Sequence, residues 1–244
     1  ILLSCVDEPR DYALVEKILD IGKKNPWIIS DVKAGEQKRS PRAPFTTSTL
    51  QQTASSRLGF SPSRTMQVAQ KLYEQGHITY MRTDSTNLSA QAQGQILGLV
   101  EKKYGKDYVQ PRMYKTKSKN AQEAHEAIRP THVETMRVGN NSDEERLYKL
   151  IWERAVSSQM SDAKLEKTKI IATIVGHEDL PAFATNGSRV LFPGWLAVDT
   201  DARGEDVELP KLAKGDVLDL KDIRSEEKAT QPPGRYSEAG LIKE

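Results

Sequence analysis

Tyr80 and Arg82 are the two residues of this sequence best suited to chemistry on a phosphodiester. They lie in ITYMRTDSTNLS at 78–89. A tyrosine hydroxyl acts as a nucleophile where its surroundings help to remove its proton, and a guanidinium group matches the oxygens of a phosphate. We expect HITYM at 77–81 to form a short strand, and residues two apart in a strand share a face. Taken alone, however, such a pair is more often a half-buried tyrosine beside a surface arginine.

A second group of reactive side chains lies in EAHEAIRPT at 123–131. His125 and Arg129 are four residues apart, which places them on one face if the segment is helical. A histidine beside a phosphate could hydrogen-bond a non-bridging oxygen or transfer a proton. The alternative is a helix end with an ordinary hydrogen-bonded histidine, and for this segment alone that alternative is favoured.

The elements that must position these residues form a helical block between two β-rich ends. Near the N-terminus, apolar spacing predicts a helix over 11–19 that Gly22 caps, and then a strand over 27–32. The polar stretch 33–44 has the composition of a linker. From residue 168 the apolar period is two, which predicts strands, a hairpin turning at Asn186-Gly187, and a further strand over 216–223. The simplest arrangement is a β domain interrupted by a helical insertion.

Within the helical block, capping residues mark where helices begin and end. Two short helices, a tight turn containing Gly76 and the predicted strand at 77–81 resemble a winged helix-turn-helix. The predicted starts are Thr47 or Ser48, Ser61 followed by Pro62, Ser89, and Ser142 paired with Glu145, and the predicted stops are Gly59 and Gly76.

Composition excludes several classes of protein. The 244 residues suffice for one or two domains, and the net charge is only +2. No apolar run is long enough for a membrane span, and the single cysteine, Cys5, excludes an internal disulfide and a four-cysteine zinc site. Because the sequence begins with Ile1 rather than methionine, we expect it to be a piece of a longer protein.

For predicting contacts to DNA, the local clustering of charged residues is more informative than the net charge of the chain. Four basic residues fall close together and are candidate contacts to DNA phosphates: Arg112, Lys115, Lys117 and Lys119. A second run, Lys33, Lys38, Arg39 and Arg42, reads more simply as a solvated linker. The pair Asp199 and Asp201 could hold a metal ion, but its polar, glycine-containing surroundings indicate a solvated turn. We therefore predict no metal site in this chain.

Considered together, ITYMRTDS at 78–85 and EAHEAIRPT at 123–131 resemble the active-site signatures of the type IA DNA topoisomerases. The stretch APFTTSTLQQTASSRLGFSPSRTMQVAQKLYEQGHITYMRTDSTNLS at 43–89 resembles the bacterial topoisomerase I members almost throughout. The tail QPPGRYSEAGLIKE at 231–244 resembles the segment where the chain of these enzymes returns from the arch toward the base.

The resemblance implies roles for matching residues. Tyr80 would be the nucleophile that attacks one DNA strand and becomes joined to its 5′-phosphate, with Arg82 assisting cleavage and His125 in the same pocket. Supporting roles fall to Thr83, Asp84, Glu126 and Arg129. The family's Mg²⁺ is bound by a Toprim domain that has no counterpart here, so this piece alone is expected to be inactive. No ATP is needed, because a phosphotyrosine diester conserves the energy of the cleaved bond.

The resemblance also implies the fold and the setting. We expect an α+β protein in which a β-rich arch domain, residues 1–39 and 166–230, is interrupted by a mainly helical cap domain, residues 40–165. The cap would have a winged-helix-like core and carry Tyr80, and residues 231–244 would form a hinge and the start of the next domain. The implied partners are single-stranded or underwound DNA and the rest of the same polypeptide, in the bacterial cytoplasm at the nucleoid.

Two alternatives remain open. One is a non-catalytic winged-helix module that binds DNA, although such a module has no reason to carry both signatures. The other is the equivalent part of topoisomerase III or reverse gyrase. The lead-in APFTTSTLQQ and Met81 favour topoisomerase I.

Overall fold

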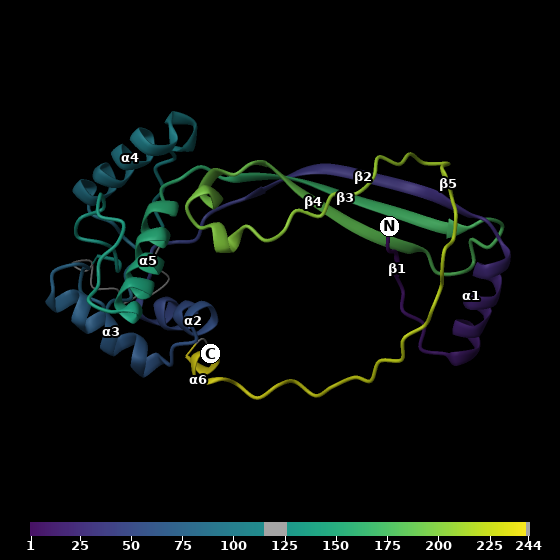
Figure 1. Cartoon of the computed structure of the whole chain (residues 1–244), viewed down its shortest axis with the longest axis horizontal. Helices are drawn as coiled ribbons and strands as arrows, with labels where there is room; N and C mark the ends of the chain where they lie inside the picture. The colour runs from purple at the N-terminus through teal and green to yellow at the C-terminus, as the bar shows by residue number, and fades with distance from the viewer. Residues whose placement is uncertain (115–125, 243–244) are drawn as a thin grey trace. The chain divides into compact units, whose positions relative to one another are not determined.

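The computed structural model describes residues 1–114 and 126–242, which divide into two compact units. The first unit comprises Ile1–Lys38, Lys164–Phe192 and Glu205–Pro232. The second comprises Arg39–Ala163, Pro193–Gly204 and Pro233–Glu244. The chain therefore passes between the units several times, as the colour gradient of Figure 1 traces.

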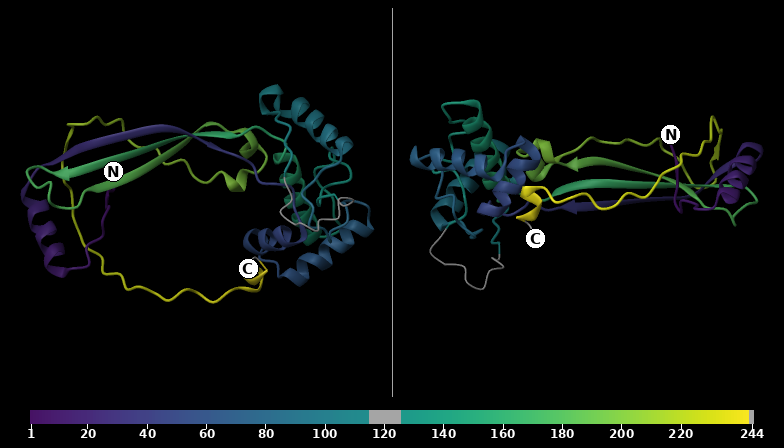
Figure 2. Two further views of the ribbon diagram at one scale, coloured as in Figure 1. Left: turned by 180° about the vertical axis from the view of Figure 1, so that it is seen from behind. Right: turned by 90° about the horizontal axis from the view of Figure 1, so that it is seen from below.

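The first unit is built on a five-stranded sheet with the order β1-β4-β3-β2-β5. The pairs β1–β4, β3–β4 and β2–β5 are antiparallel. Figures 1 and 2 show the long strands β2, β3 and β4 running side by side. The strands are β1 (Ser4–Cys5), β2 (Trp27–Arg39), β3 (Ala163–Ile174), β4 (Phe183–Phe192) and β5 (Val217–Leu218).

Helix α1 (Tyr12–Lys24) lies at one end of this sheet (Figure 1) and contributes Ile18 to its buried core. It ends at Asn25 rather than at the predicted Gly22. Gly22 is instead buried inside the helix, where an added Cβ would lie 3.1 Å from the ring of Trp27. The glycine thus permits close helix–sheet packing. The buried core comprises Ile18, Trp27, Ile29, Ile170, Ala172, Ile174 and Leu180.

The second unit is helical. Helices α2, α3 and α5 contact one another, and α5 is buried along most of its length. The predicted caps at Gly59, Ser61 and Ser89 are confirmed, whereas α2 begins after Thr46 and α5 after Asn141, each within two residues of the predicted cap. The elements are α2 (Thr47–Leu58), α3 (Pro62–Glu74), α4 (Ala90–Tyr104), η1 (Lys106–Tyr108), α5 (Ser142–Ser157), η2 (Gly194–Ala197), η3 (Thr200–Ala202) and α6 (Glu238–Leu241).

Two expectations about the strands are wrong. The predicted linker at 33–44 is strand up to Arg39, because ladder hydrogen bonds do not require apolar side chains and these side chains are largely exposed. Strand β4 also runs straight through the predicted turn, with Asn186 opposite Lys169 and Gly187 opposite Thr168. A Cβ on Gly187 would lie 2.7 Å from Leu209 Cγ, so this glycine leaves room for a covering segment.

Residues 193–204 pack with the helical unit, although they lie between stretches of the β-rich unit in the sequence. The indole of Trp195 donates a hydrogen bond to the carbonyl of Arg39 at 2.8 Å. Arg57 of α2 also donates two hydrogen bonds to Asp199, at 2.7 and 3.1 Å. These contacts hold the segment against α2 and the end of β2.

The predicted combination of helices with an antiparallel sheet is confirmed. The winged-helix interpretation is not confirmed, because within the described part of the chain HITYM at 77–81 forms a single bridge, between Ile78 and Pro130, and no strand. Among the described residues, no helix has the length and apolar character needed to cross a membrane.

Candidate functional site

Tyr80 lies in an extended segment, residues 80–85, that follows the end of α3. Exposed and buried side chains alternate along this segment, although it is not a strand. Tyr80 and Arg82 both reach solvent, as the predicted chemistry requires, because Met81 between them turns inward. The exposed members are Tyr80, Arg82 and Asp84, and the buried members are Met81, Thr83 and Ser85.

The first residue of α2 anchors this segment. The Thr47 amide donates to the Thr83 carbonyl at 2.9 Å, and the Thr47 hydroxyl donates to the Met81 carbonyl at 2.7 Å. In return, the Thr83 amide donates to the Thr47 hydroxyl oxygen at 2.9 Å. Because Met81 and Thr83 are fixed at their backbones, the intervening Arg82 projects from a defined position.

The ring of Tyr80 rests against a second tyrosine. Tyr73, on the last turn of α3, meets it edge-on, with ring centroids 5.2 Å apart and planes at 63°. Tyr80 is 43% exposed and Tyr73 is 41% exposed. The hydroxyl of Tyr80 makes no hydrogen bond to any other described residue. A fixed ring with a free hydroxyl suits a nucleophile.

The segment after His125 lies directly beside the tyrosine segment. The Thr79 amide donates to the Arg129 carbonyl at 2.9 Å, and the Thr79 hydroxyl donates to the Ala127 carbonyl at 2.7 Å. The Ile128 amide donates to the carbonyl of Phe45 at 2.8 Å. The fold thus brings the two sequence motifs together at Thr79. His125 itself lies outside the described residues.

Glu126 and Arg129 form an internal brace. Arg129 donates to one Glu126 oxygen at 2.5 and 3.1 Å, and the Ser89 amide at the start of α4 donates to the other at 2.5 Å. Burial by itself would raise the pKa of Glu126, but these hydrogen bonds outweigh it and lower the pKa below its usual value. The Glu126 and Arg129 side chains therefore hold the start of α4 against the 126–131 segment.

Thr83 and Asp84, the other two predicted supporting residues, differ in solvent exposure. Thr83 is buried, and its hydroxyl oxygen accepts the amide of Ser85 at 3.0 Å, which shapes the turn of the backbone. Asp84 is exposed and forms no ion pair with any described residue. Thr83 is thus structural in this arrangement, whereas Asp84 is open to solvent beside Arg82.

Arg112, a predicted DNA contact, has internal partners instead. Its guanidinium donates to Asp162 at 2.5 Å, to the Met160 carbonyl at 3.2 Å and to Gln110 at 2.8 Å. These bonds tie the end of the 105–114 segment to the residues after α5. The other three members of the run, Lys115, Lys117 and Lys119, lie outside the described residues.

Arg154 is a buried residue near the site that the sequence analysis missed. Its guanidinium lies 4.1 Å from the ring centroid of Phe45, and the residue is only 6% exposed. Burial, together with the positive charge of Arg42, lowers the pKa of Arg154 to about 10. The sequence spacing could have revealed this burial, because Arg154 follows Leu150 by four residues and so lies on the buried side of α5.

The Asp199-Thr200-Asp201 stretch is only partly the solvated turn expected: Thr200 and Asp201 are exposed, but Asp199 is 3% exposed and paired with Arg57. This hydrogen-bonded pairing raises the pKa of Arg57, since it favours the charged guanidinium. Within residues 1–114 and 126–242, no three His, Cys, Asp or Glu side chains are grouped closely enough to hold a metal ion.

Comparison with known proteins places this geometry in context. A family model described as DNA topoisomerase matches residues 5–244. The chain is 44% identical to DNA topoisomerase 1 of Synechocystis over 252 residues, and 47% identical to DNA topoisomerase 1 of Streptomyces coelicolor over 257 residues. Each alignment covers 98% of this chain but only 27% and 26% of the respective relative. The chain thus spans about a quarter of the length of these relatives.

A solved structure is similar as well. Full-length topoisomerase I from Thermotoga maritima matches with a TM-score of 0.78 at 32% sequence identity. The match covers 99% of this chain and 40% of that one.

Proposed function

Because this chain belongs to the DNA topoisomerase family, among the bacterial topoisomerase I proteins, we propose that it is the part of a type IA enzyme that carries the nucleophilic tyrosine. The observation that carries the proposal is the setting of Tyr80: the residue is 43% exposed, its hydroxyl has no hydrogen-bond partner among the described residues, and its ring rests on Tyr73. Tyr80 also lies two residues from an exposed arginine in a segment anchored to α2.

In the proposed reaction the oxygen of Tyr80 loses its proton and attacks the phosphorus of one DNA phosphodiester. A phosphotyrosine bond forms to the 5′-phosphate, the bond to the 3′-oxygen breaks, and that oxygen leaves with a proton. Resealing is the reverse attack by the 3′-hydroxyl. One diester replaces another at each step, so no nucleotide hydrolysis is required.

The neighbouring residues divide into those that meet the phosphate and those that hold the site. The Arg82 guanidinium is exposed and suits the non-bridging oxygens, whose negative charge it would offset. His125 would hydrogen-bond the same phosphate. Glu126 and Arg129 hold the 126–131 segment, which follows His125 in the sequence, through the brace to Ser89.

Magnesium is assigned to another domain. The described residues offer no cluster of carboxylates that would fit the ion. We propose that a Toprim domain in the rest of the polypeptide, which the family resemblance implies, holds Mg²⁺ and supplies the acid that protonates the leaving 3′-oxygen. The chain alone is then an incomplete enzyme.

We further infer that the two units act as the arch and the cap of the enzyme. The sheet unit corresponds to the arch, and the helical unit with Tyr80 to the cap. The chain crosses between the units near residues 38, 163, 192, 204 and 232, and these crossings, the last beside the 231–236 tail, are the expected hinge positions. While the cleaved strand stays on Tyr80, a second strand would pass through the opened gate, which relaxes negative supercoils.

A reconstitution experiment tests this proposal. The chain is incubated with end-labelled single-stranded DNA and Mg²⁺, with and without a separately expressed Toprim-containing piece. We expect covalent protein–DNA complexes only in the mixture, retaining a 3′-end label and not a 5′-end label, and none with Tyr80→Phe. An adduct that persists in Tyr80→Phe would overturn the assignment.

The same experiment separates the enzyme from a simple DNA-binding module. A winged-helix module would bind duplex DNA tightly without the Toprim piece, form no adduct, and be indifferent to Tyr80→Phe. The names of the two curated relatives favour topoisomerase I over topoisomerase III and reverse gyrase.

A further inference from the structure

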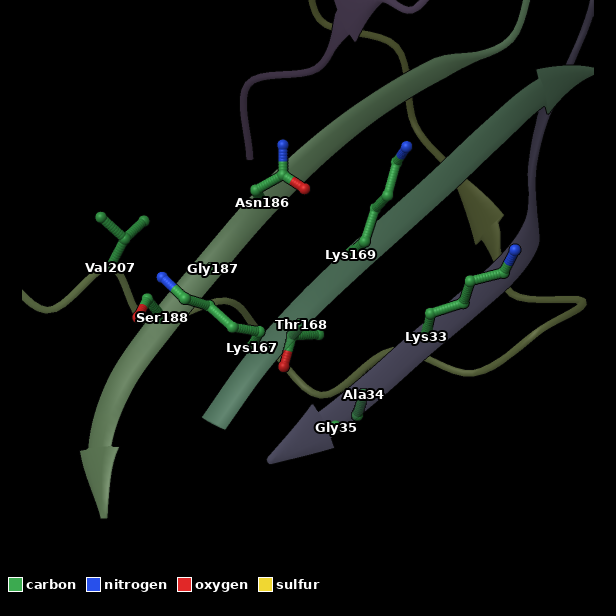
Figure 3. Close-up of a pocket in the computed structure, with 10 residues that line it drawn as sticks. All are labelled: Lys33, Ala34, Gly35, Lys167, Thr168, Lys169, Asn186, Gly187, Ser188 and Val207. Atoms are coloured by element: carbon green, nitrogen blue, oxygen red, sulfur yellow. The ribbon is translucent and has the colours of Figure 1, made fainter. Parts of the chain in front are cut away.

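An open groove of about 440 Å³ lies on the sheet of the first unit, separate from the tyrosine segment (Figure 3). It crosses β2, β3 and β4 and is bordered by Val207. Three lysines rise from β2 and β3: Lys33, Lys167 and Lys169. Asn186 and Ser188 of β4 add uncharged polar groups.

The pleat of the sheet places these side chains together. On β3, Ile170 and Ala172 are buried in the core, so Lys167 and Lys169 project from the opposite face. The register sets Lys167 opposite Ser188 and Lys169 opposite Asn186 on β4, which puts all four on that same face. Helix α1 packs against the core on the other face.

The floor of the groove is low because its residues are small. Ala34 and Gly35 of β2 line the groove and offer little or no side chain. An extended polymer could therefore approach the strands closely between the lysines.

Two of the three lysines that line the groove have no ion-pair partner among the described residues. The lining of the groove holds three ammonium groups and no carboxylate among the described residues. Lys33 lies 3.5 Å from Asp31, but Lys167 and Lys169 form no ion pair within the described chain. The neighbouring Glu166 is taken by Arg189 at 2.6 Å. Two unpaired cations on one face fit an anionic ligand.

We propose that this groove binds the phosphodiester backbone of single-stranded DNA, with Lys167 and Lys169 as the main phosphate contacts and Lys33 at the edge. The inference builds on the proposed function, since it takes DNA as the substrate. It adds a contact surface on the β-rich unit, outside the tyrosine site. The contact reads no sequence, because it recognises charge and not base edges.

The test is the salt dependence of binding, measured by fluorescence anisotropy with a labelled single-stranded oligonucleotide and the full-length protein. Each phosphate contact contributes a slope of about 0.7 to log K against log salt for single strands, so Lys167→Gln with Lys169→Gln is expected to reduce the slope by about 1.4. The matched control is Lys23→Gln with Lys214→Gln, which removes the same charge from exposed positions outside the groove. Far-ultraviolet circular dichroism checks that both variants are folded.

An unchanged slope in the groove variant, or an equal reduction in the control, would overturn the proposal. Adduct formation by Tyr80 is scored in the same preparations. If the slope is unchanged but Tyr80→Phe still abolishes the adduct, the groove fails and the enzymatic proposal stands. If Tyr80→Phe keeps the adduct, the enzymatic proposal fails whatever the slope.

Discussion

At the scale of single residues, the exposure of Tyr80 depends on neighbours that carry no chemistry. Met81, Thr83 and Ser85 are buried, and this forces the residues between them outward. Thr47 fixes the backbone at Met81 and Thr83. A motif that reads as catalytic thus mixes residues that would touch the substrate with residues that hold them in place.

Tyr73 is predicted to position the nucleophile. Tyr73→Ala removes the edge-on ring contact and should slow adduct formation in the full-length protein by about three- to tenfold, given about 0.5–1.5 kcal/mol for an aromatic pair. Tyr73→Phe keeps the ring and should restore the rate. The measurement is single-turnover cleavage at saturating oligonucleotide. Equal loss in both variants would point to the hydroxyl of Tyr73 and contradict the packing role.

The Glu126 brace predicts a pH-dependent stability. The pKa of the Glu126 carboxyl is lowered in the folded state. Its contribution to the free energy of unfolding is therefore present above the usual carboxyl pKa of about 4.3 and is lost as the pH falls through the pKa of the folded state. Glu126→Gln should lower the Tm at pH 7, and the difference from the parent should shrink below about pH 4. Glu101→Gln, at a half-exposed position on α4, is the control. A Tm difference that stays constant with pH would contradict the ionic role.

At the scale of elements, helix ends could be predicted from the sequence, whereas the pairing of distant segments could not. The caps at Gly59, Ser61 and Ser89 were predicted because each acts within one helical turn. HITYM has the composition of a strand, but within the described residues it forms a single bridge, between Ile78 and Pro130, which lies some fifty residues later. The Asn-Gly pair has the composition of a turn, yet the pairing of β4 with β3 overrides it.

The site was predictable to a similar degree. The sequence predicted that Tyr80 and Arg82 share a face, and both are exposed, while the internal use of Arg112 and the burial of Arg154 depend on partners from other elements. Spacing within one segment cannot reveal whether a charged side chain meets a carboxylate or an aromatic ring from elsewhere in the chain.

Gly187 gives a prediction for the sheet. Gly187→Ala places a Cβ 2.7 Å from Leu209 Cγ and should destabilise the protein by about 1–3 kcal/mol, the usual range for overpacking. Gly35→Ala on β2 has nothing within 4 Å of the added Cβ and is the control, with little change expected. Urea unfolding measures both. Equal stability of the two variants would show that the 205–209 segment yields without cost.

At the scale of the whole molecule, the small net charge of +2 conceals an uneven distribution. Acidic side chains pair internally with Arg57, Arg112 and Arg129, while Lys167 and Lys169 on the sheet form no ion pair with any described residue. Average charge is therefore a poor guide to DNA binding in this chain. The local arrangement of charges decides where a phosphate backbone could bind.

Mapping the covalent adduct in the full-length protein determines whether Tyr80 becomes joined to DNA. The protein is incubated with an oligonucleotide and Mg²⁺, denatured, and digested with trypsin and nuclease. Cleavage after Lys71 and Arg82 releases LYEQGHITYMR, which contains both Tyr73 and Tyr80. Fragmentation in a mass spectrometer should place the nucleotide on Tyr80. A nucleotide on Tyr73, or on a peptide from elsewhere in the protein, would contradict the account.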